Sequence, residues 1–394
     1  MPAGLLSASA GQHPWSRRRK PEGGCIQKAT KCCLDSCFRH RSPNFFLLII
    51  AVCALLYILF YIYISNQIII DDQYEGAVNA DVLRQKKDFS QVIVARTCSK
   101  TTSLCYKVVD SVINPSDVQR ELFTVGAGEF DSETLVLLSP KEPGASFDTS
   151  DTRFWSVSHS KVLSSYVTGL AVAPFVFGPI PLKEEDPNAR KPFQVLSIGL
   201  GGGNLDMFWN NLHKNLNQTV VELDEAVVRL GREWFGVEES EARRTVVGDG
   251  VVFVKEAAAR GAKFDVVVVD ACDLDTKLPC PAAPFLHHGV IQAIHSIVTD
   301  DGVLVINVLP LAGESNPQVE EALAPVRSIF SSCFEMHVER ENNVIVSCTK
   351  KTVPIGHEYL LFVEKRMEAA LASLGLGDVV SRVERAKKKN PKLT

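Results

Sequence analysis

The sequence lacks any strong excess of charge of one sign. Its 394 residues include 42 Lys and Arg against 46 Asp and Glu, which gives a formal net charge of −4. Proteins that bind nucleic acid usually carry a basic surface, so we predict no nucleic-acid partner. Hydrophobic residues make up 46% of the chain, which is ordinary for a globular protein, and the length is ample for one α/β domain with additions.

A zinc-binding pattern is also lacking. Four of the 11 cysteines lie at positions 25, 32, 33 and 37, but two of them are adjacent and the histidine spacing of a zinc site is missing. We therefore predict no metal, and lipid attachment to these cysteines is the alternative. Residues 1–43 are rich in Ser, Gly, Arg and Cys, which is typical of a disordered tail.

Charged residues are absent from one long stretch, residues 44–66. Almost every residue from Phe45 to Ile64 is apolar, and about 20 such residues suffice to cross the hydrocarbon core of a bilayer. A signal peptide would begin nearer the N-terminus, and a buried core helix would carry some polar residues. Tyrosines at positions 57, 61 and 63 gather toward one end, as interfacial aromatics do. We therefore predict a single transmembrane helix over residues 44–66.

The flanking charges predict the orientation of this helix. Basic residues dominate upstream, where Arg17, Arg18, Arg19, Lys20, Lys28, Lys31, Arg39 and Arg41 stand against Glu22 and Asp35. Downstream, Asp71, Asp72 and Glu75 come before any basic residue. The positive-inside rule then leaves residues 1–43 in the cytosol and makes the main domain lumenal or extracellular, in the endomembrane system or at the plasma membrane. Residues 67–88 are polar and charged, and we expect them to form a stalk.

Two features bear on this topology. One is the glycosylation sequon at Asn217, which we expect in a surface loop of a glycoprotein. The other is the placement of the six later cysteines, which form three close pairs: Cys98 with Cys105, Cys272 with Cys280, and Cys333 with Cys348. The first and last pairs flank polar hairpin turns, so their sulfurs would face each other across two strands. Disulfides would indicate an oxidising compartment, and free buried thiols are the alternative.

Residues 89–178 predict a small β-hairpin region that leads into the main domain. Short alternating runs around 91–97, 104–112, 120–125 and 133–138 are typical of an antiparallel sheet. Apolar residues at helical spacing then predict a helix over 157–172. Residues 179–192 are rich in proline and charge and predict a connector.

Residues 193–350 alternate between strand and helix patterns, which predicts a doubly wound parallel α/β sheet. The expected strands are 194–199, 219–223, 244–247, 264–270 and 302–309, and the expected helices are 204–214, 225–235, 251–260, 286–297 and 318–330. A hairpin at 334–339 and 343–349 would add an antiparallel edge. Residues 351–394 would hold a closing helix at 357–373 and a basic tail.

The glycine cluster after the first parallel strand predicts a nucleotide site. Gly199, Gly201 and Gly203 allow a tight turn whose backbone N–H groups approach a ligand at the start of a helix. Glu222 follows about 20 residues later, where such folds place a carboxylate on the ribose hydroxyls. A dinucleotide fingerprint would have its third glycine at position 204, which is Asn204, so the spacing favours an S-adenosyl ligand over NAD.

Acidic residues follow the successive strands and would face one crevice. They are Glu222, Asp249, Asp270 and Asp273. Asp249 could accept a hydrogen bond from the adenine amino group, and Asp270 and Asp273 could bind a substrate amine or act as a general base. Helix capping is the alternative for each acid, and for Asp273 we give it equal weight.

Taken together, Leu-Gly-Gly-Gly-Asn, Val-Glu-Leu-Asp, Gly-Asp-Gly and Asp-Ala-Cys-Asp resemble the spermidine-synthase type of fold. Glu-Trp-Phe-Gly at 233–236 and Cys-Pro-Ala-Ala-Pro-Phe at 280–285 more closely resemble the C-terminal half of the methyltransferase-like protein 13 family, the elongation-factor lysine and N-terminal methyltransferases. The similarity covers about residues 110–350. It implies a Rossmann-like methyltransferase domain with S-adenosyl-L-methionine as cofactor and protein amines as substrates.

Carried onto this chain, the resemblance assigns a role to each candidate residue. Gly199, Gly201 and Gly203 would cradle the methionine moiety, Glu222 would hold the ribose, Asp249 the adenine, and Asp270 would border the sulfonium. Aminopropyl transfer to a polyamine is the runner-up, but those enzymes carry an aspartate in place of Asn204. A neutral Asn204 better tolerates the carboxylate of intact S-adenosylmethionine.

A third interpretation is an inactive, membrane-held binding module. S-adenosylmethionine is made in the cytosol, so a lumenal enzyme would need the cofactor to be imported. The acceptor is therefore left open as an amine of a protein or of a polyamine, and a homodimer is compatible with the sequence.

Overall fold

The computed structural model describes the chain mainly from residue 90 onward. The described parts are Ala54, Leu56, Tyr57, and residues 90–114, 117–125, 134–183, 191–212, 215–273, 278–310, 316–339, 341–354, 356–377 and 380–385. In these parts, no helix is both long and apolar enough to cross a membrane. The predicted tail, transmembrane helix and stalk lie outside the described residues, apart from the three residues between 54 and 57.

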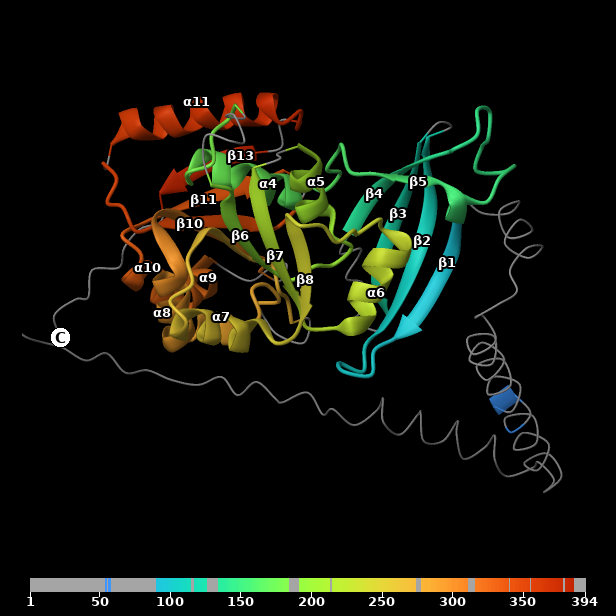
Figure 1. Ribbon diagram of the computed structural model, residues 1–394, viewed down its shortest axis with the longest axis horizontal. Helices are drawn as coiled ribbons and strands as arrows, with labels where there is room; N and C mark the ends of the chain where they lie inside the picture. The colour runs from blue at the N-terminus through green and yellow to red at the C-terminus, as the bar shows by residue number, and fades with distance from the viewer. Residues whose placement is uncertain are drawn as a thin grey trace, which may run out of the picture. The chain divides into compact units, whose positions relative to one another are not determined.

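The first unit of the fold is a five-stranded antiparallel sheet, which confirms the predicted hairpin region (Figure 1). Its strands, in spatial as in chain order, are β1 (Gln91–Cys98), β2 (Cys105–Asn114), β3 (Asp117–Val125), β4 (Thr134–Ser139) and β5 (Ser156–Ser158). Alternate residues of β3 and β4 are buried, so one face of this sheet packs against the rest of the molecule. A short 3-10 helix, η1 (Thr152–Phe154), precedes β5.

The second sheet has eight strands in the order β13-β11-β12-β10-β9-β6-β7-β8. They are β6 (Phe193–Ile198), β7 (Leu216–Glu222), β8 (Arg243–Val247), β9 (Phe264–Val269), β10 (Val298–Val308), β11 (Ser332–Val338), β12 (Val344–Thr349) and β13 (Val380–Arg385). Strands β8, β7, β6, β9 and β10 run parallel, and β12, β11 and β13 extend the sheet in antiparallel fashion. The doubly wound sheet with an antiparallel edge is confirmed.

Helices cover both faces of this sheet. Along β9, Val266 and Val268 pack toward one layer of helices and Val267 and Val269 toward the other, because successive strand residues point to opposite faces. The first layer holds α4 (Ser165–Val176), α5 (Asn204–Leu212) and α11 (His357–Ser373). The second holds α7 (Gly250–Ala259), η2 (Ala283–Leu286), α8 (His288–Ile297), α9 (Asn316–Ala322) and α10 (Ala324–Ile329).

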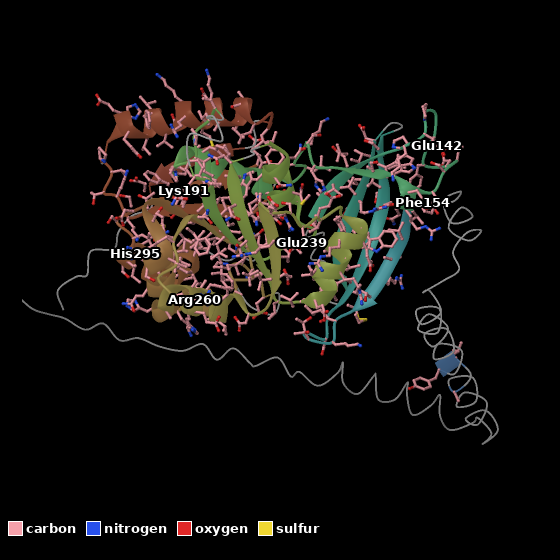
Figure 2. The ribbon with its side chains drawn as sticks, in the orientation of Figure 1. Glu142, Phe154, Lys191, Glu239, Arg260 and His295 are labelled. Atoms are coloured by element: carbon pink, nitrogen blue, oxygen red, sulfur yellow. A yellow bond between two sulfur atoms is a disulfide. The ribbon has the colours of Figure 1, made fainter. Side chains whose placement is uncertain are left out.

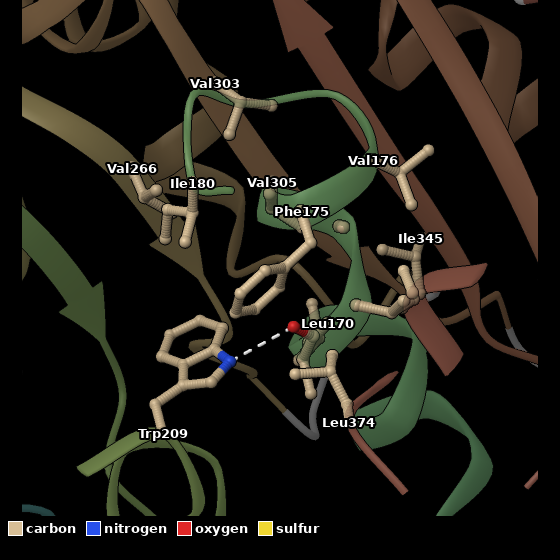
Figure 3. Packing of buried hydrophobic residues seen from close by; sticks show 14 of the residues in the cluster. Leu170, Phe175, Val176, Ile180, Trp209, Val266, Val303, Val305, Ile345 and Leu374 are labelled. Carbon is tan, nitrogen blue, oxygen red and sulfur yellow. Dashed lines mark hydrogen bonds between the residues drawn. The ribbon is translucent and has the colours of Figure 1, made fainter. Parts of the chain in front are cut away.

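Helix α4 is buried on every side between the sheet and α11. From Val167 to Val176 each of its residues is buried, and the Trp209 indole donates to the Ala171 carbonyl at 3.1 Å (Figure 3). The helix lies later in the chain than the predicted 157–172. A helix that is buried on all sides has no polar face. The spacing of its apolar residues therefore does not indicate where the helix begins and ends.

Helix α6 (Glu225–Trp234) joins the two sheets. Val227 and Leu230 of this helix pack with Val108 and Leu122 of the small sheet in one buried cluster. The fully buried Arg120 of β3 anchors the small sheet there as well, because its guanidinium donates to the Trp234 carbonyl of α6 at 2.8 Å. Arg120 is itself paired with Asp110 of β2 at 2.7 Å. Figure 1 shows α6 between the large sheet and the strands of the small sheet.

One expectation was wrong, that of the sequon. The sequon residue Asn217 lies within β7 rather than in a surface loop, because the strand begins three residues earlier than predicted. Its side chain donates to Gln194 on the neighbouring strand, and Gln218 and Thr219 are buried, so this segment is a poor glycosylation acceptor. A strand that the sequence analysis did not predict follows the closing helix, because residues 380–385 form β13, which pairs with β11. The rest of the predicted basic tail lies outside the described residues.

Candidate functional site

The glycine turn joins β6 to α5 at the carboxyl edge of the parallel strands. Gly199 has φ +97°, and a Cβ on this residue would lie 2.3 Å from the backbone oxygen of Asp270. Gly201 and Gly203 also have positive φ. The chain can therefore turn from β6 into α5, close against the end of β9, only because glycine occupies position 199.

This turn lies where an open sheet places its ligand. β6 pairs with β7 on one side and with β9 on the other, and the chain reaches β9 only after it has built β7 and β8. The connections that leave the carboxyl ends of these central strands therefore go to opposite sides, which is the switch point of a doubly wound sheet.

Glu222 is the last residue of β7, and its half-buried carboxylate is fixed to the glycine turn. Oε2 accepts from the Leu200 backbone N–H at 2.8 Å, and Oε1 accepts from that of Asp224 at 2.9 Å. Each carboxylate oxygen can accept more than one hydrogen bond, so this orientation is compatible with binding a pair of ribose hydroxyls. The predicted pairing of the glycines with Glu222 is therefore present in the structure.

Asp249 follows β8 on the same edge and caps helix α7. Its Oδ1 accepts from the backbone N–H groups of Val251 at 2.7 Å and Val252 at 3.3 Å. The capping interpretation is thus correct for this exposed residue, and a role toward adenine would be additional to it.

Asp270 follows β9 directly and is held by two side-chain amides in series, those of Asn307 and Asn343, which we call the amide relay. Its Oδ1 accepts from Asn307 Nδ2 at 2.8 Å, and Asn307 Oδ1 accepts from Asn343 Nδ2 at 2.8 Å. Asn307 is near the end of β10 and Asn343 in the turn before β12, and both are buried. Both asparagines were missed at the sequence level, since nothing local marks them as neighbours of Asp270.

Asp273 lies in an exposed loop three residues further on. The Cys272–Cys280 disulfide closes this loop, and the Asp273 backbone N–H donates to the Pro279 carbonyl at 2.7 Å. The loop leaves β9 at the same edge as Asp270, so the structure places both residues on the side of the sheet that holds the glycine turn.

Asn204 begins helix α5 and contacts the small sheet. Its side chain is 4% exposed, and Nδ2 donates to the Leu135 carbonyl at 2.9 Å. Because a carbonyl can only accept, this bond fixes which end of the amide is the oxygen. Oδ1 has no hydrogen-bond partner within the described ranges. The neighbouring Gly202 N–H donates to Thr134 Oγ1 at 2.7 Å, so strand β4 packs directly against the glycine turn.

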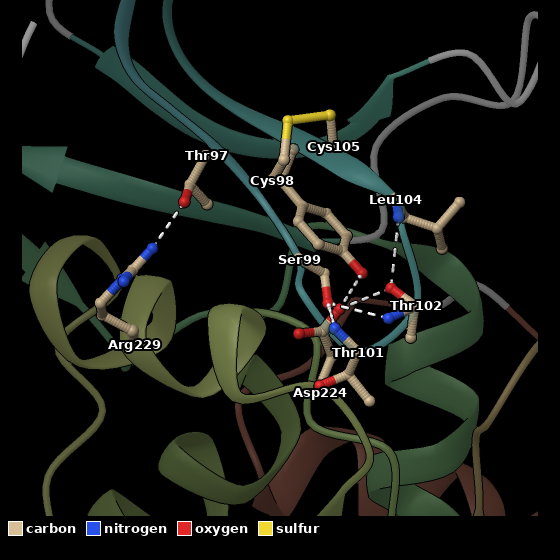
Figure 4. The surroundings of a disulfide bond; sticks show 10 residues. Thr97, Cys98, Ser99, Thr101, Thr102, Leu104, Cys105, Asp224 and Arg229 are labelled. Atoms are coloured by element: carbon tan, nitrogen blue, oxygen red, sulfur yellow. Dashed lines mark hydrogen bonds between the residues drawn. A yellow bond between two sulfur atoms is a disulfide. The ribbon is translucent and has the colours of Figure 1, made fainter. Parts of the chain in front are cut away.

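Asp224 is a further residue of the site that the sequence analysis missed. Its Oδ1 accepts from the Ala226 N–H and caps α6, and its Oδ2 accepts from the hydroxyls of Tyr106 and Thr102 (Figure 4). Burial acts to raise its pKa, but the hydrogen bonds, first of all that from Tyr106, outweigh it and leave the pKa below its ordinary value. An acid directly before an amphipathic helix signals a cap, whereas no local signal marks its partners, Tyr106 on β2 and Thr102 in the turn between β1 and β2.

Exposed apolar side chains surround the acids of this edge. Leu223 is 51% exposed, and Val247 and Val252 are each 50% exposed. Leu223 directly follows Glu222, the acid assigned to the ribose. Val247 ends β8 and Val252 lies in the first turn of α7, so both are within about three residues of Asp249, the acid assigned to the adenine. Apolar surface beside a few fixed polar groups is typical of a small-molecule site.

The edge of the site beyond β7 is held by a buried ion pair. Arg243 at the start of β8 pairs with Asp206 of α5 and approaches Glu239. Glu239, which is labelled in Figure 2, lies in the connection from α6 to β8. Burial raises the pKa of Asp206 despite the neighbouring guanidinium. The pair ties the first helix after the glycine turn to the outer strand.

All three expected disulfides are present. Cys98 pairs with Cys105, Cys272 with Cys280, and Cys333 with Cys348. In the first and last pairs the cysteines face each other directly across antiparallel strands, as the hairpin registers predicted.

A glycine turn at the switch point, with an acid at the tip of the next strand, defines a Rossmann-like domain of the nucleoside-binding class. Residues 183–338 match the spermine/spermidine synthase domain family. Part of the chain is similar to the eEF1A lysine and N-terminal methyltransferases, the relatives that the motifs predicted: it is 27% identical to that of Danio rerio over 216 residues, or 54% of this chain and 29% of the relative. It thus spans less than a third of that relative's length.

A solved structure with a TM-score above 0.5 shares the fold. A probable spermidine synthase from Corynebacterium glutamicum has a TM-score of 0.52 at 13% identity, over 74% of this chain and 90% of that chain. Human methyltransferase-like protein 13 in complex with SAH has a TM-score of 0.47 at 21% identity, over 55% of this chain and 94% of that chain.

Proposed function

We propose that this protein is an S-adenosylmethionine-dependent methyltransferase that acts on an amine of a protein or small molecule. The observation that carries the proposal is the Glu222 carboxylate, which is hydrogen-bonded to the glycine turn at the switch point of the sheet. The methyltransferase names of the relatives support it. Because those relatives are much longer, the acceptor that they are named for, eEF1A, is no more than a candidate here.

The residues at the site fit the cofactor. Gly199, Gly201 and Gly203 would hold the methionine moiety and Glu222 the ribose. Asp249 would contact the adenine, with Leu223 and Val252 beside it. Asn204 offers a buried amide oxygen that can accept from the amino group of the cofactor.

The carboxylates after β9, Asp270 and Asp273, would bind and deprotonate the acceptor amine. The cofactor supplies a methyl group activated by the positive charge on sulfur. An amine attacks only with its lone pair free, so it must lose a proton before or during transfer. Asp270, held by Asn307, and the exposed Asp273 are the groups that would orient the amine and take this proton.

Aminopropyl transfer is the second candidate, and the spermine/spermidine synthase domain match favours it. The residue that separates the two reactions is Asn204. An aspartate there would repel the carboxylate of intact S-adenosylmethionine, whereas a neutral amide does not. We therefore place methyl transfer first, with an inactive binding module as the remaining alternative.

We further propose that residues 44–66 anchor the protein in a membrane with residues 1–43 in the cytosol. The three disulfides support a lumenal or extracellular domain, because disulfides persist in oxidising compartments. Protease added to sealed vesicles should then digest only the N-terminal tail. Complete digestion of the domain in intact vesicles would reverse the orientation.

The experiment for the activity is calorimetry on the full chain in detergent, with intact and decarboxylated S-adenosylmethionine and with S-adenosylhomocysteine. Binding of intact cofactor and of S-adenosylhomocysteine supports a methyltransferase. Preference for the decarboxylated form supports aminopropyl transfer. No heat with any of the three would leave only the inactive module.

A further inference from the structure

The small sheet reaches the cofactor acid through a line of hydrogen bonds. The hydroxyls of Tyr106 and Thr102 each donate to Asp224 Oδ2 at 2.8 Å (Figure 4). The backbone N–H of Asp224 donates to Glu222 Oε1 at 2.9 Å, and Glu222 Oε2 accepts from Leu200 in the glycine turn. Two side chains from the strand β2 hairpin are therefore connected to the proposed ribose-binding acid by a single intervening residue.

Asp224 has little freedom in this arrangement. Its side chain is 3% exposed, and its other oxygen caps helix α6 through the Ala226 N–H at 2.9 Å. A carboxylate that accepts three such bonds is fixed in both position and rotamer, because charge-assisted hydrogen bonds are short and strongly directional. Its own backbone N–H, which binds Glu222, is fixed with it.

The turn that carries Thr102 is itself constrained. Ser99 Oγ accepts from the N–H groups of Thr101 at 2.9 Å and Thr102 at 3.0 Å. The Cys98–Cys105 disulfide closes the turn at its base, one residue before Tyr106. Thr102 and Tyr106 thus approach Asp224 from a turn with a fixed shape.

We propose that Tyr106 and Thr102 are positioning residues for the cofactor: they hold Asp224 and, through its backbone N–H, set the orientation of the Glu222 carboxylate. Neither residue needs to touch the ligand. The inference rests on the proposed function, because it assigns to the small sheet a part in the affinity of that same site. It also explains why the turn between β1 and β2 is fixed covalently.

A merely structural role predicts something different. If the two hydroxyls only attach the small sheet to α6, their loss lowers the free energy of unfolding and leaves ligand affinity unchanged. If they act through Glu222, their loss weakens the affinity, and this effect requires an intact carboxylate at position 222. The two roles are separated by a double-mutant cycle, in which coupled residues show non-additive effects.

The test is calorimetric titration of the detergent-solubilised full chain with S-adenosylhomocysteine. Tyr106→Phe and Thr102→Val each remove one hydroxyl at nearly constant volume. Thr101→Val is the matched control, since Thr101 lies in the same turn and is exposed. We expect about fivefold weaker binding for each of the first two variants, about one hydrogen bond's worth of free energy, and no change for the control.

The same changes are then made in a Glu222→Gln background, which retains one acceptor oxygen and keeps binding measurable. There we expect Tyr106→Phe to have less than a twofold effect. An equal loss in both backgrounds, or unchanged affinity in the Tyr106→Phe protein with lowered melting temperature, would overturn the positioning role. Absence of binding by the unmodified chain would instead reject the proposed function itself.

Discussion

The side-chain amide of Asn307 donates to the carboxylate of Asp270 at 2.8 Å across neighbouring strands of the parallel sheet. The bond joins the end of β10 to the first residue after β9, and it presents an N–H rather than a carbonyl to the acid. That orientation is fixed from outside the sheet, because Asn343 donates to the oxygen of the same amide.

Replacement of Asn343 by leucine should destabilise the protein through this relay. The substitution keeps the number and branching of the side-chain heavy atoms but leaves the buried Asn307 oxygen without its donor, which costs about 1–3 kcal/mol of unfolding free energy. Urea denaturation followed by tryptophan fluorescence measures the loss. Asn342→Leu is the control, because Asn342 is exposed in the same turn and its change should cost less than about 0.5 kcal/mol. Equal losses at both positions would contradict the relay.

Replacement of Glu222 by alanine should remove cofactor binding without unfolding the domain. We expect affinity for S-adenosylhomocysteine to fall at least about tenfold, since a charged acceptor for two ribose hydroxyls is lost. Glu225→Ala is the comparison, because this residue is exposed in the first turn of α6, three positions away. Calorimetry that gives the same affinity for the Glu222 variant as for the unmodified chain would move the site elsewhere.

Much of the large sheet could be read from local pattern. Val266 to Val269 is a run of β-branched residues that only a strand buried on both faces accommodates, and β9 is that strand. The glycines predict the turn after β6, and Glu222 ends β7, the next strand along the chain. Each of these features is encoded in a short local stretch, so periodicity and turn chemistry suffice to find it.

The remainder depends on contacts between distant parts of the chain. Tyr106 meets Asp224 across 118 residues, and Asn307 meets Asp270 across 37, so no local spacing reveals either pair. Strand β13 is built from Val-Ser-Arg-Val-Glu-Arg, which has few apolar residues, and it is a strand because the edge of β11 pairs with it. Tertiary pairing overrides the weak local preference there.

Asp224→Asn should make the free energy of unfolding depend less on pH in the acidic range. The folded pKa of Asp224 lies below its ordinary value of 3.8, so the folded state binds the proton less tightly than the unfolded state. Its ionised form therefore stabilises the protein above that value, and this stability is lost as the pH falls through the lowered folded pKa. The difference in unfolding free energy between the unmodified chain and Asp224→Asn should be largest near neutrality and shrink below pH 3.8. Glu225→Gln, the same charge change on the exposed next residue, is the comparison.

Gly199→Ala tests the turn itself. The new methyl group would meet the Asp270 carbonyl at 2.3 Å, and the residue would keep a φ of +97°, so backbone atoms of two strands must move. Gly261→Ala is a matched control, because Gly261 also has a positive φ, +69°, but a methyl group on it would have no other atom within 4 Å. We expect about 1 kcal/mol for the control and at least about 3 kcal/mol, with loss of ligand binding, for Gly199→Ala. Similar costs at both sites, measured by urea denaturation, would show that conformation rather than the close contact dictates glycine here.

Two disulfides of the same cross-strand type allow a comparison within one molecule. Cys98→Ser with Cys105→Ser opens the turn that carries Thr102, and Cys333→Ser with Cys348→Ser opens the hairpin of β11 and β12. Loop-closure entropy predicts a similar loss of about 2–3 kcal/mol of unfolding free energy for each double variant. Only the first should also weaken binding of S-adenosylhomocysteine, by about threefold, because only its turn is hydrogen-bonded to Asp224. If both double variants lost affinity equally, the effect would be one of general stability, and the turn between β1 and β2 would have no particular connection to Glu222.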